Sequence, residues 1–163
     1  MAPKTEQRLV RVPLVYRVLF LWFEPLAAFT GSIVIHNDPA KFLRALSAVG
    51  DYAPSNRVVY NNLCATYTLF AFNEGILLRR TNDLKVWRTV LIGILICDAL
   101  HLSASWAELG SALFWNPLAW RGDDWINLGS LWGQAFMRVL FLFGVGLKGN
   151  VSTVTVDVVK KDM

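Results

Sequence analysis

Apolar residues along the chain are gathered into four long runs, which cover about residues 14–35, 58–78, 86–107 and 125–147. A helix that crosses the hydrocarbon core of a bilayer needs about 20 mostly apolar residues, and each run meets that length. A soluble helical bundle would carry a stripe rich in Lys and Glu along every helix, and these runs lack one. The pattern predicts an all-α fold: a polytopic membrane four-helix bundle, built as a single four-span transmembrane domain over residues 1–163.

The composition supports helices that face lipid. Hydrophobic residues make up 55% of the chain and charged residues 17%, and the mean hydropathy is +0.41, whereas soluble domains are about 45–50% apolar. The first run is too long for the apolar part of a signal peptide, and no small-residue cleavage site follows it. We therefore expect it to remain as a span. Residues 42–49, in the first connection, have the pattern of a short helix at the membrane surface.

Lys and Arg gather at the amino end as far as the first turn of the first run, around the connection between the second and third runs, and at the carboxyl end. The members of these clusters are Lys4, Arg8, Arg11, Arg17, Arg79, Arg80, Lys85, Arg88, Lys148, Lys160 and Lys161. Loops on the cytosolic side of a membrane are enriched in Lys and Arg, so both termini are predicted to be cytosolic, with residues 148–163 as a cytosolic tail. Basic residues that only flank apolar runs do not form the basic stripe of a nucleic-acid binder, and no nucleic-acid partner is expected.

The tail ends in Lys160-Lys161-Asp162-Met163, which is similar to the dilysine signal that returns membrane proteins to the endoplasmic reticulum. Such a signal is read by a receptor and does not anchor the chain. The alternative is a basic tail that is simply solvated. With the signal, the predicted location is the endoplasmic reticulum membrane, as a multi-pass protein.

Several ionisable side chains lie inside the apolar runs, where each costs at least about 2.5–3.5 kcal/mol and marks a candidate functional site. Glu24, Asp98 and Arg138 fall near the middle of their runs, and Gln134 is one turn from Arg138. Asp98 and His101 share one helix face. Polar faces at this depth must meet protein or trapped water. We therefore expect one polar pocket inside the bundle, with aromatic walls that include Trp22, Phe70, Phe72, Trp106 and Trp132.

The charges in this interior do not balance. Three carboxylates, Glu24, Glu74 and Asp98, face the single arginine Arg138. An ion pair of Arg138 with Asp98 or Glu24 could be purely structural, because polar groups often hold membrane helices together. At least one carboxyl group would still be buried without a cation, which favours its protonated form. A neutral acid beside an ionised one is how apolar sites perform acid–base chemistry, and proton donation to an apolar substrate is the predicted reaction.

The catalytic roles follow from this imbalance. Asp98 is predicted to donate the proton, with His101 setting its acidity, and Glu24 to act as the base or cation-stabilising carboxylate, with Glu74 as its alternative. The predicted substrate-binding residues are Asn73, Asn127, Gln134, Arg138, Tyr67, Trp22, Trp106 and Trp132. Asp98 and His101 could ligate a metal, but catalytic zinc normally has three protein ligands. Neither a metal nor a cofactor is therefore predicted.

Several segments resemble a family of small four-span fungal integral membrane proteins: residues 20–25 (FLWFEP), 69–74 (LFAFNE), 86–91 (VWRTVL), 98–101 (DALH) and 124–127 (DWIN). The resemblance covers nearly the whole chain except the last dozen residues. It implies a place beside polyketide and terpenoid biosynthetic enzymes, acting on epoxidised polyenes. The architecture is also similar to EXPERA-type sterol isomerases and to membrane-bound meroterpenoid cyclases, with no residue-by-residue match that carries over catalytic positions.

The hypothesis is an intramembrane enzyme that opens, cyclises or isomerises a lipophilic polyketide or terpenoid, of the epoxide hydrolase or cyclase type. One alternative is a non-catalytic protein that binds a sterol or another membrane lipid in the same pocket. Another is an assembly partner of a larger membrane enzyme. The sequence leaves the oligomeric state open, a homo-oligomer included.

Overall fold

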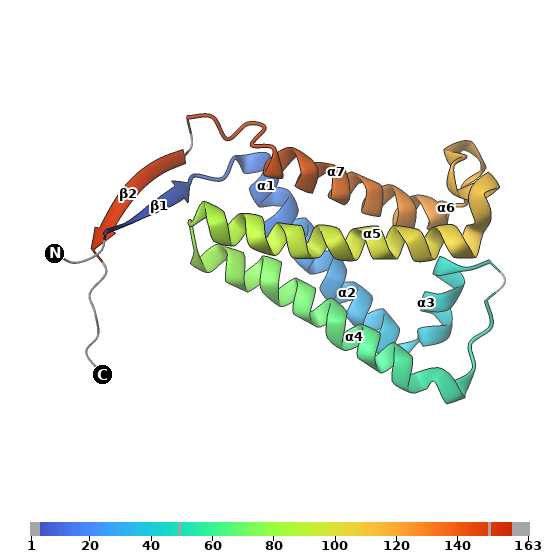
Figure 1. The fold of residues 1–163 in the computed structure, drawn as a ribbon. Helices are drawn as coiled ribbons and strands as arrows, with labels where there is room; N and C mark the ends of the chain where they lie inside the picture. The colour runs from blue at the N-terminus through green and yellow to red at the C-terminus, as the bar shows by residue number, and fades with distance from the viewer. Residues whose placement is uncertain (1–3, 49, 150, 158–163) are drawn as a thin grey trace.

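The computed structural model describes residues 4–48, 50–149 and 151–157, and this part of the chain is mostly helical (Figure 1). Four long helical segments run lengthwise beside one another. The first consists of α1 (Leu14–Val18), the π-helical turn η1 (Leu19–Phe23) and α2 (Glu24–Asn37). The second consists of η2 (Pro54–Asn56), α4 (Arg57–Phe72), the π-helical turn η3 (Asn73–Leu77) and η4 (Leu78–Arg80). The third is α5 (Leu84–Phe114), and the fourth consists of α6 (Gly122–Asp124), the π-helical turn η6 (Trp125–Gly129) and α7 (Ser130–Leu142).

The predicted helices are therefore present over all four apolar runs. Two of them, Leu14–Asn37 and Leu84–Phe114, are long and apolar enough to cross a membrane by length and composition. A short helix, α3 (Pro39–Leu46), lies in the first connection, slightly earlier than predicted. Asp38 sets its start, because its carboxylate accepts the backbone N–H of Lys41 at 2.8 Å and Pro39 follows in the first helical position. A single turn, η5 (Pro117–Ala119), precedes α6.

The fourth helix ends at Leu142, whereas the sequence predicted helix to residue 147. Gly144 adopts φ of +78°, its N–H reaches the carbonyl of Phe141, and the N–H of Val145 reaches that of Leu140, both at 2.9 Å. These two bonds form a Schellman motif, which closes the helix at a left-handed glycine. The motif is tied to the first segment, because the hydroxyl of Tyr16 donates to the carbonyl of Val145 at 2.9 Å.

The two ends of the described chain form a β-ribbon, so the all-α prediction was wrong there. β1 (Lys4–Val10) pairs antiparallel with β2 (Val151–Asp157), from Lys4 opposite Asp157 to Val10 opposite Val151. β-branched residues occupy every position of 151–156 except Ser152, and they favour a strand. The N–H of Val10 also donates to the carbonyl of Asn82 at 2.7 Å, which fixes the ribbon to the α4–α5 connection. Lys160 and Lys161 lie outside the described residues.

The bundle is built from two helix pairs, since α2 packs along α4 and α5 packs along α7. The first pair comes close at Gly31, where an added Cβ would lie 2.9 Å from the ring of Tyr67. At the ribbon end, which is the end of the bundle that carries β1 and β2, the pairs enclose a core. Its main members are Val10, Val12, Tyr16, Phe20, Leu21, Leu78, Leu84, Trp87, Leu91, Phe141 and Leu147. The opposite end, which carries α3, η5 and α6, is called the loop end below.

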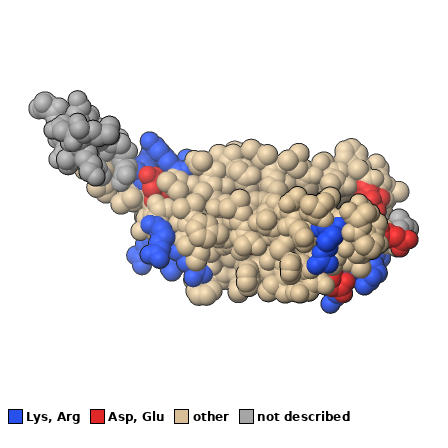
Figure 2. All heavy atoms as spheres, turned by 90° about the horizontal axis from the view of Figure 1, so that it is seen from below, with Lys and Arg blue, Asp and Glu red and all other residues tan. Residues whose placement is uncertain are grey.

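Large apolar side chains cover the outside of the bundle. Leu26, Ile96, Leu100 and Phe136 are each between 58% and 65% exposed. Figure 2 shows that charged side chains on the viewed face gather toward the two ends and leave a broad band without them. On a soluble monomer this band would be an unusually large apolar patch, and such patches mark protein or membrane contacts.

Candidate functional site

Arg138 lies at the centre of three carboxylates inside the bundle. Its Nη1 donates to Oδ2 of Asp98 at 2.5 Å, and its Nη2 donates to both Glu24 and, at 3.1 Å, Glu74. All four side chains are at most 8% exposed. The sequence predicted an ion pair of Arg138 with Asp98 or Glu24 and a carboxyl group left without a cation. The structure instead brings every one of the three carboxyl groups to the same guanidinium.

The charge surplus nevertheless remains, because one guanidinium cannot balance three carboxylates. Glu24 and Glu74 share Nη2, so their carboxyl groups lie next to each other, whereas Asp98 has Nη1 to itself. Like charges this close in a buried site cannot all stay ionised, which favours a proton on one member of the Glu24–Glu74 pair. Oε1 of Glu24 is buried and has no hydrogen-bond partner among the described residues.

Backbone irregularities lie at two of these three carboxylates, Glu24 and Glu74. The π-helical turn η1 ends directly before Glu24, and η3 contains Glu74. Such turns are rare and occur often at functional sites. Pro25 lacks an N–H, so the carbonyl of Leu21 lacks the donor that an α-helix would supply four residues ahead. Arg79 takes that place: its guanidinium donates to the Leu21 carbonyl and lies 4.0 Å from the ring centroid of Trp22. Arg79 thereby joins the helix of Glu74 to the helix of Glu24.

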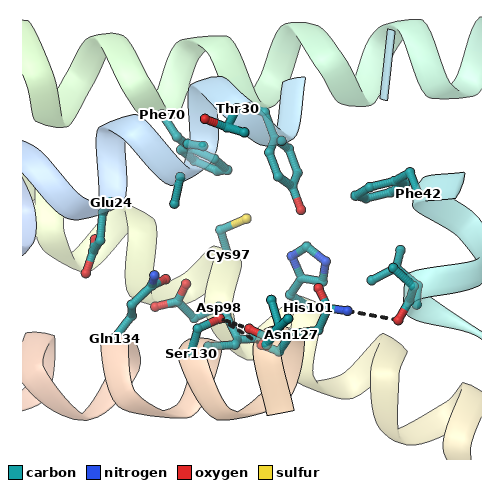
Figure 3. A pocket seen from close by; sticks show the side chains of 18 of the residues that line it. Glu24, Thr30, Phe42, Phe70, Cys97, Asp98, His101, Asn127, Ser130 and Gln134 are labelled. Atoms are coloured by element: carbon teal, nitrogen blue, oxygen red, sulfur yellow. Dashed lines mark hydrogen bonds between the residues drawn. The ribbon is translucent and has the colours of Figure 1, made fainter. Parts of the chain in front are cut away.

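A cavity of about 380 Å³ extends from this cluster toward the loop end, between the two helix pairs (Figure 3). Small residues on α2 give it room. Its lining residues are Glu24, Ala27, Ala28, Thr30, Gly31, Val34, Lys41, Phe42, Ala45, Leu46, Tyr67, Phe70, Glu74, Ile94, Cys97, Asp98, His101, Ser105, Ile126, Asn127, Ser130, Leu131, Gln134 and Arg138. Apolar atoms form most of the lining surface, and its charged wall is the Arg138 cluster. This is the usual composition of a small-molecule site, apolar with a few polar groups that fix orientation.

Many of the predicted site residues line this cavity. They are Glu24, Glu74, Asp98, His101, Tyr67, Asn127, Gln134 and Arg138. His101 makes a ring contact with Tyr67, with centroids 6.5 Å apart, but no hydrogen bond joins it to Asp98 within the described chain. The predicted control of Asp98 by His101 therefore lacks a direct contact, and the partner of Asp98 is Arg138.

The predicted aromatic walls were mostly wrong. Trp22, Trp106 and Trp132 are 56%, 46% and 40% exposed and lie outside the lining, as does Phe72. Residues two positions apart on a helix face nearly opposite sides, and Trp22, Phe72 and Trp132 each precede a lining residue by two positions. Trp106 instead donates from its indole to Ser111 Oγ at 2.9 Å. Of the five predicted wall residues, Phe70 lines the cavity.

Asn73 and two other polar residues of the second segment also lie away from the cavity. Asn73 is half-buried outside the lining, next to Glu74, while Asn62 and Thr66 are exposed. Thr66 donates to the carbonyl of Asn62 at 3.1 Å, within its own helix. A hydroxyl satisfied in this way does not require a polar interior, which is why this face can turn outward.

Several residues that line the cavity were not among the site residues predicted from the sequence. Ser130 lies between Asn127 and Gln134 on the same helix face, and Cys97 lies four residues before His101, so helical spacing could have found both. Phe42 comes from α3, and no spacing within a long helix could have placed it. Figure 3 shows Phe42 at the end of the cavity away from Glu24. The α3 helix is held there by Asn127, whose side-chain amide donates to the carbonyl of Ala45 at 2.9 Å.

A second ionic contact lies at the loop end, outside the apolar segments. Asp124 is buried, and its carboxylate accepts the backbone N–H of Arg121 at 2.8 Å. The same carboxylate accepts two hydrogen bonds from the guanidinium of Arg121, from Nη2 at 2.7 Å and from Nε at 3.0 Å. These hydrogen bonds hold the pKa of the Asp124 carboxyl below its ordinary value, and they raise the pKa of Arg121. Asp124 lies in the first turn of the fourth segment, where an acid that accepts the capping N–H stabilises the helix start.

The described residues include no group of three or more His, Cys, Asp and Glu side chains arranged to hold a metal ion. The guanidinium of Arg138 contacts all three buried carboxylates. The arrangement is therefore a helical bundle with an apolar surface and a buried carboxylate–guanidinium wall beside a cavity. A family model described as a domain of unknown function (DUF7704) matches residues 9–148, and the chain belongs to this family. The match includes all four helical segments and ends before β2. No curated protein and no solved structure matches the chain.

Proposed function

We propose that the chain spans a membrane four times, with the ribbon end in the cytosol, and that its cavity is the active site of an acid–base enzyme for a lipophilic small molecule. The exposed apolar band supports the first part. The ribbon keeps both ends of the described chain on one side. Arg11, Arg79, Arg80 and Lys85 are exposed at that end, and a basic end favours the cytosolic side.

The observation that carries the second part is the charged wall of the cavity. Three carboxyl groups surround one guanidinium at the edge of an otherwise largely apolar space. A buried acid that holds its proton can give it to a substrate that water would not protonate. An ionised neighbour can then stabilise the positive charge that develops, and it does so strongly because water is largely excluded.

The contacts favour an exchange of the roles predicted from the sequence. Asp98 has its own guanidinium nitrogen, Nη1, and is the better candidate for a carboxylate that stays ionised. Glu24 shares Nη2 with Glu74 and has an unpartnered oxygen. We therefore assign proton donation to Glu24 and stabilisation of the developing cation to Asp98. Gln134 and His101, which line the same cavity, would orient the substrate oxygen.

The step balances without a further reactant for ring closure and needs one water for hydrolysis. The Glu24 O–H protonates an epoxide oxygen, the adjacent C–O bond breaks, and its electron pair goes to that oxygen. The carbon, now positive, is attacked either by water or by a hydroxyl of the same molecule, and the proton lost by this nucleophile returns to Glu24. The products are a diol or a cyclic ether. With a plain alkene, protonation at one carbon and loss of a proton from a neighbour gives a shifted double bond.

The test uses microsomes that carry the wild type, Glu24→Gln, Asp98→Asn or the control Glu108→Gln. Glu108 is exposed at the loop end, and its substitution changes the total charge as Glu24→Gln does. Each sample is incubated with a panel of lipophilic epoxides and polyenes and analysed by mass spectrometry. We expect a product of unchanged mass, or one that has gained a water, and a rate loss of about 10²–10⁴-fold in Glu24→Gln. Full turnover by the double variant Glu24→Gln/Asp98→Asn would rule out this mechanism.

The substrate class and the compartment rest on the sequence. The resemblance to small fungal membrane proteins extends the proposal to polyketides and terpenoids, and Lys160 with Lys161 extends it to the endoplasmic reticulum. The apolar share of the cavity lining supports a second candidate function, a protein that binds a sterol or another lipid without converting it. That function predicts a lipid retained through purification in both the wild type and Glu24→Gln, with no product in the panel.

A further inference from the structure

The charged wall of the cavity carries more negative than positive charge. If the three carboxyl groups at Arg138 are all ionised, two negative charges are in excess, and a proton shared by Glu24 and Glu74 still leaves one. The other cationic residue in the lining is Lys41, an exposed residue of α3 at the loop end. The interior of the cavity therefore favours a positively charged occupant, since a buried charge is stable when a counter-charge meets it.

One oxygen is available to meet such a charge. Oε1 of Glu24 has no hydrogen-bond partner among the described residues, although Glu24 is only 3% exposed. Figure 3 shows the carboxyl group of Glu24 pointing away from its helix at the same end of the cavity as Gln134 and Asp98. A buried acceptor that lacks a donor costs about 1–3 kcal/mol, and a ligand that donates an N⁺–H to it would recover that energy.

The rest of the cavity sets the shape of the ligand. Between the charged wall and Phe42, polar groups come from Thr30, His101 and Ser130, and the apolar part of the lining includes Ala27, Ala28, Val34, Phe70 and Ile94. These apolar side chains bury hydrocarbon and offer no hydrogen bonds, and Tyr67 with Phe70 adds aromatic rings that attract a cation. A small hydrophilic cation would leave this surface unfilled, whereas an ammonium group on a hydrocarbon body would satisfy both parts.

From this juxtaposition we infer that the cavity binds lipophilic amines, with the protonated nitrogen against Oε1 of Glu24 and the hydrocarbon body toward Phe42. The inference rests on the charge and lining of the proposed active site but not on turnover. If Glu24 is the proton donor of the proposed reaction, the same amine is also an inhibitor, because its ammonium pairs with the ionised Glu24 carboxylate and excludes the substrate from it.

The experiment measures equilibrium binding to the full chain in nanodiscs of phosphatidylcholine, which has no net charge, with empty nanodiscs to subtract partitioning. The probe is tritium-labelled N,N-dimethyldodecylamine, and its matched neutral partner is N,N-dimethyldodecanamide. We expect the wild type to bind the amine at least about tenfold more tightly than the amide. Glu24→Gln should lose at least about tenfold in amine affinity with little change for the amide, and Glu108→Gln should change neither.

Equal affinity of the wild type for amine and amide would overturn the inference, and this comparison needs no variant to fold. Unchanged amine affinity in Glu24→Gln would overturn the assignment to Glu24. If Glu24→Gln is not monodisperse, Glu74→Gln tests the negative charge of the Glu24–Glu74 pair, and unchanged amine affinity there would overturn the role of that charge. The outcomes also separate this inference from the proposed function. Amine binding without turnover of any epoxide or polyene would support the amine-binding site and contradict the proposed enzymatic function. Turnover that the amine does not inhibit would support the enzymatic function and contradict the amine-binding site.

Discussion

The same four helical segments form a packed half at the ribbon end and a hollow half toward the loop end. In the packed half, the ring of Phe141 meets Tyr16 edge-on with centroids 5.1 Å apart and stacks on Trp87 at 5.6 Å. In the hollow half, α2 presents Ala27, Ala28 and Gly31 to the space between the helix pairs. Side-chain size at facing positions therefore decides whether a pair of helices closes or encloses a cavity, because interiors fill to nearly constant density when side chains allow it.

The Arg138 cluster lies at the boundary between these halves. The guanidinium carbon is 5.9 Å from the ring centroid of Phe20, which belongs to the packed core, while its three carboxylate partners line the cavity. A charged wall backed by packed rings is held rigidly, and a rigid wall can direct its charges at a ligand. The two halves thus have separate tasks, one to fix the charges and the other to admit the molecule on which they act.

The strongest test of this division removes the cation at the boundary. In Arg138→Met, three carboxyl groups stay buried without a counter-charge, and breaking a buried ion pair from one side costs about 3–5 kcal/mol. We expect a loss of that size in the free energy of unfolding, measured by denaturant titration in detergent micelles. Glu24→Gln should cost much less, because the cluster has carboxylates in surplus.

Arg80→Met is the control for the lost positive charge, since Arg80 is exposed at the ribbon end. Adding Glu24→Gln and Asp98→Asn to Arg138→Met should recover part of the lost stability. A loss in Arg80→Met equal to that in Arg138→Met would mean that the charge of the whole molecule matters and the boundary does not.

A second test compares one aromatic ring from each half. Phe141 is fully buried in the packed half, and Phe141→Ala should cost about 3–5 kcal/mol in unfolding free energy. Phe70 already faces the cavity, so Phe70→Ala removes less buried contact and should cost less than about 1.5 kcal/mol. The same titration measures both variants. Phe70→Ala should instead change ligand affinity, and similar losses of stability in the two variants would contradict the division into halves.

Helical spacing predicted the candidate site where residues share a face. Asp98 with His101, and Gln134 with Arg138, follow spacings of three and four, and all of them line the cavity. The same rule, applied to Trp22 and Trp132, would have turned both away from the site. The prediction of aromatic walls did not apply this rule to Trp22 and Trp132, and it was wrong for both.

Contacts between helices could not be derived from the spacing within each helix. The pairing of α2 with α4 depends on Gly31 against Tyr67, and the meeting of three carboxylates at Arg138 depends on all four segments together. Spacing identifies each face but not its neighbour. The β-ribbon was missed for a similar reason, because the partner strand of β2 lies at the other end of the chain.

The smallest expected effect on the free energy of unfolding comes from the ion pair at the loop end. Unlike the Arg138 cluster, this pair has equal numbers of positive and negative groups. Asp124 and Arg121 form a one-to-one pair at the loop end, and Arg121 is 36% exposed, so solvent screens the pair to less than about 1 kcal/mol. The pKa of Asp124 is lowered in the folded chain. Its stabilising contribution is therefore complete above the ordinary aspartate pKa of about 3.9 and is lost as the pH falls through the lower, folded value.

Asp124→Asn should accordingly lower the unfolding free energy at neutral pH and have progressively less effect below about pH 4. The measurement is the difference between wild type and variant across that pH range. Asp123→Asn is the matched control, because Asp123 is exposed and its carboxylate forms no hydrogen bond among the described residues. A difference that stays constant with pH would show that Asp124 acts through the shape of the helix start, and that the charge of this balanced pair contributes nothing.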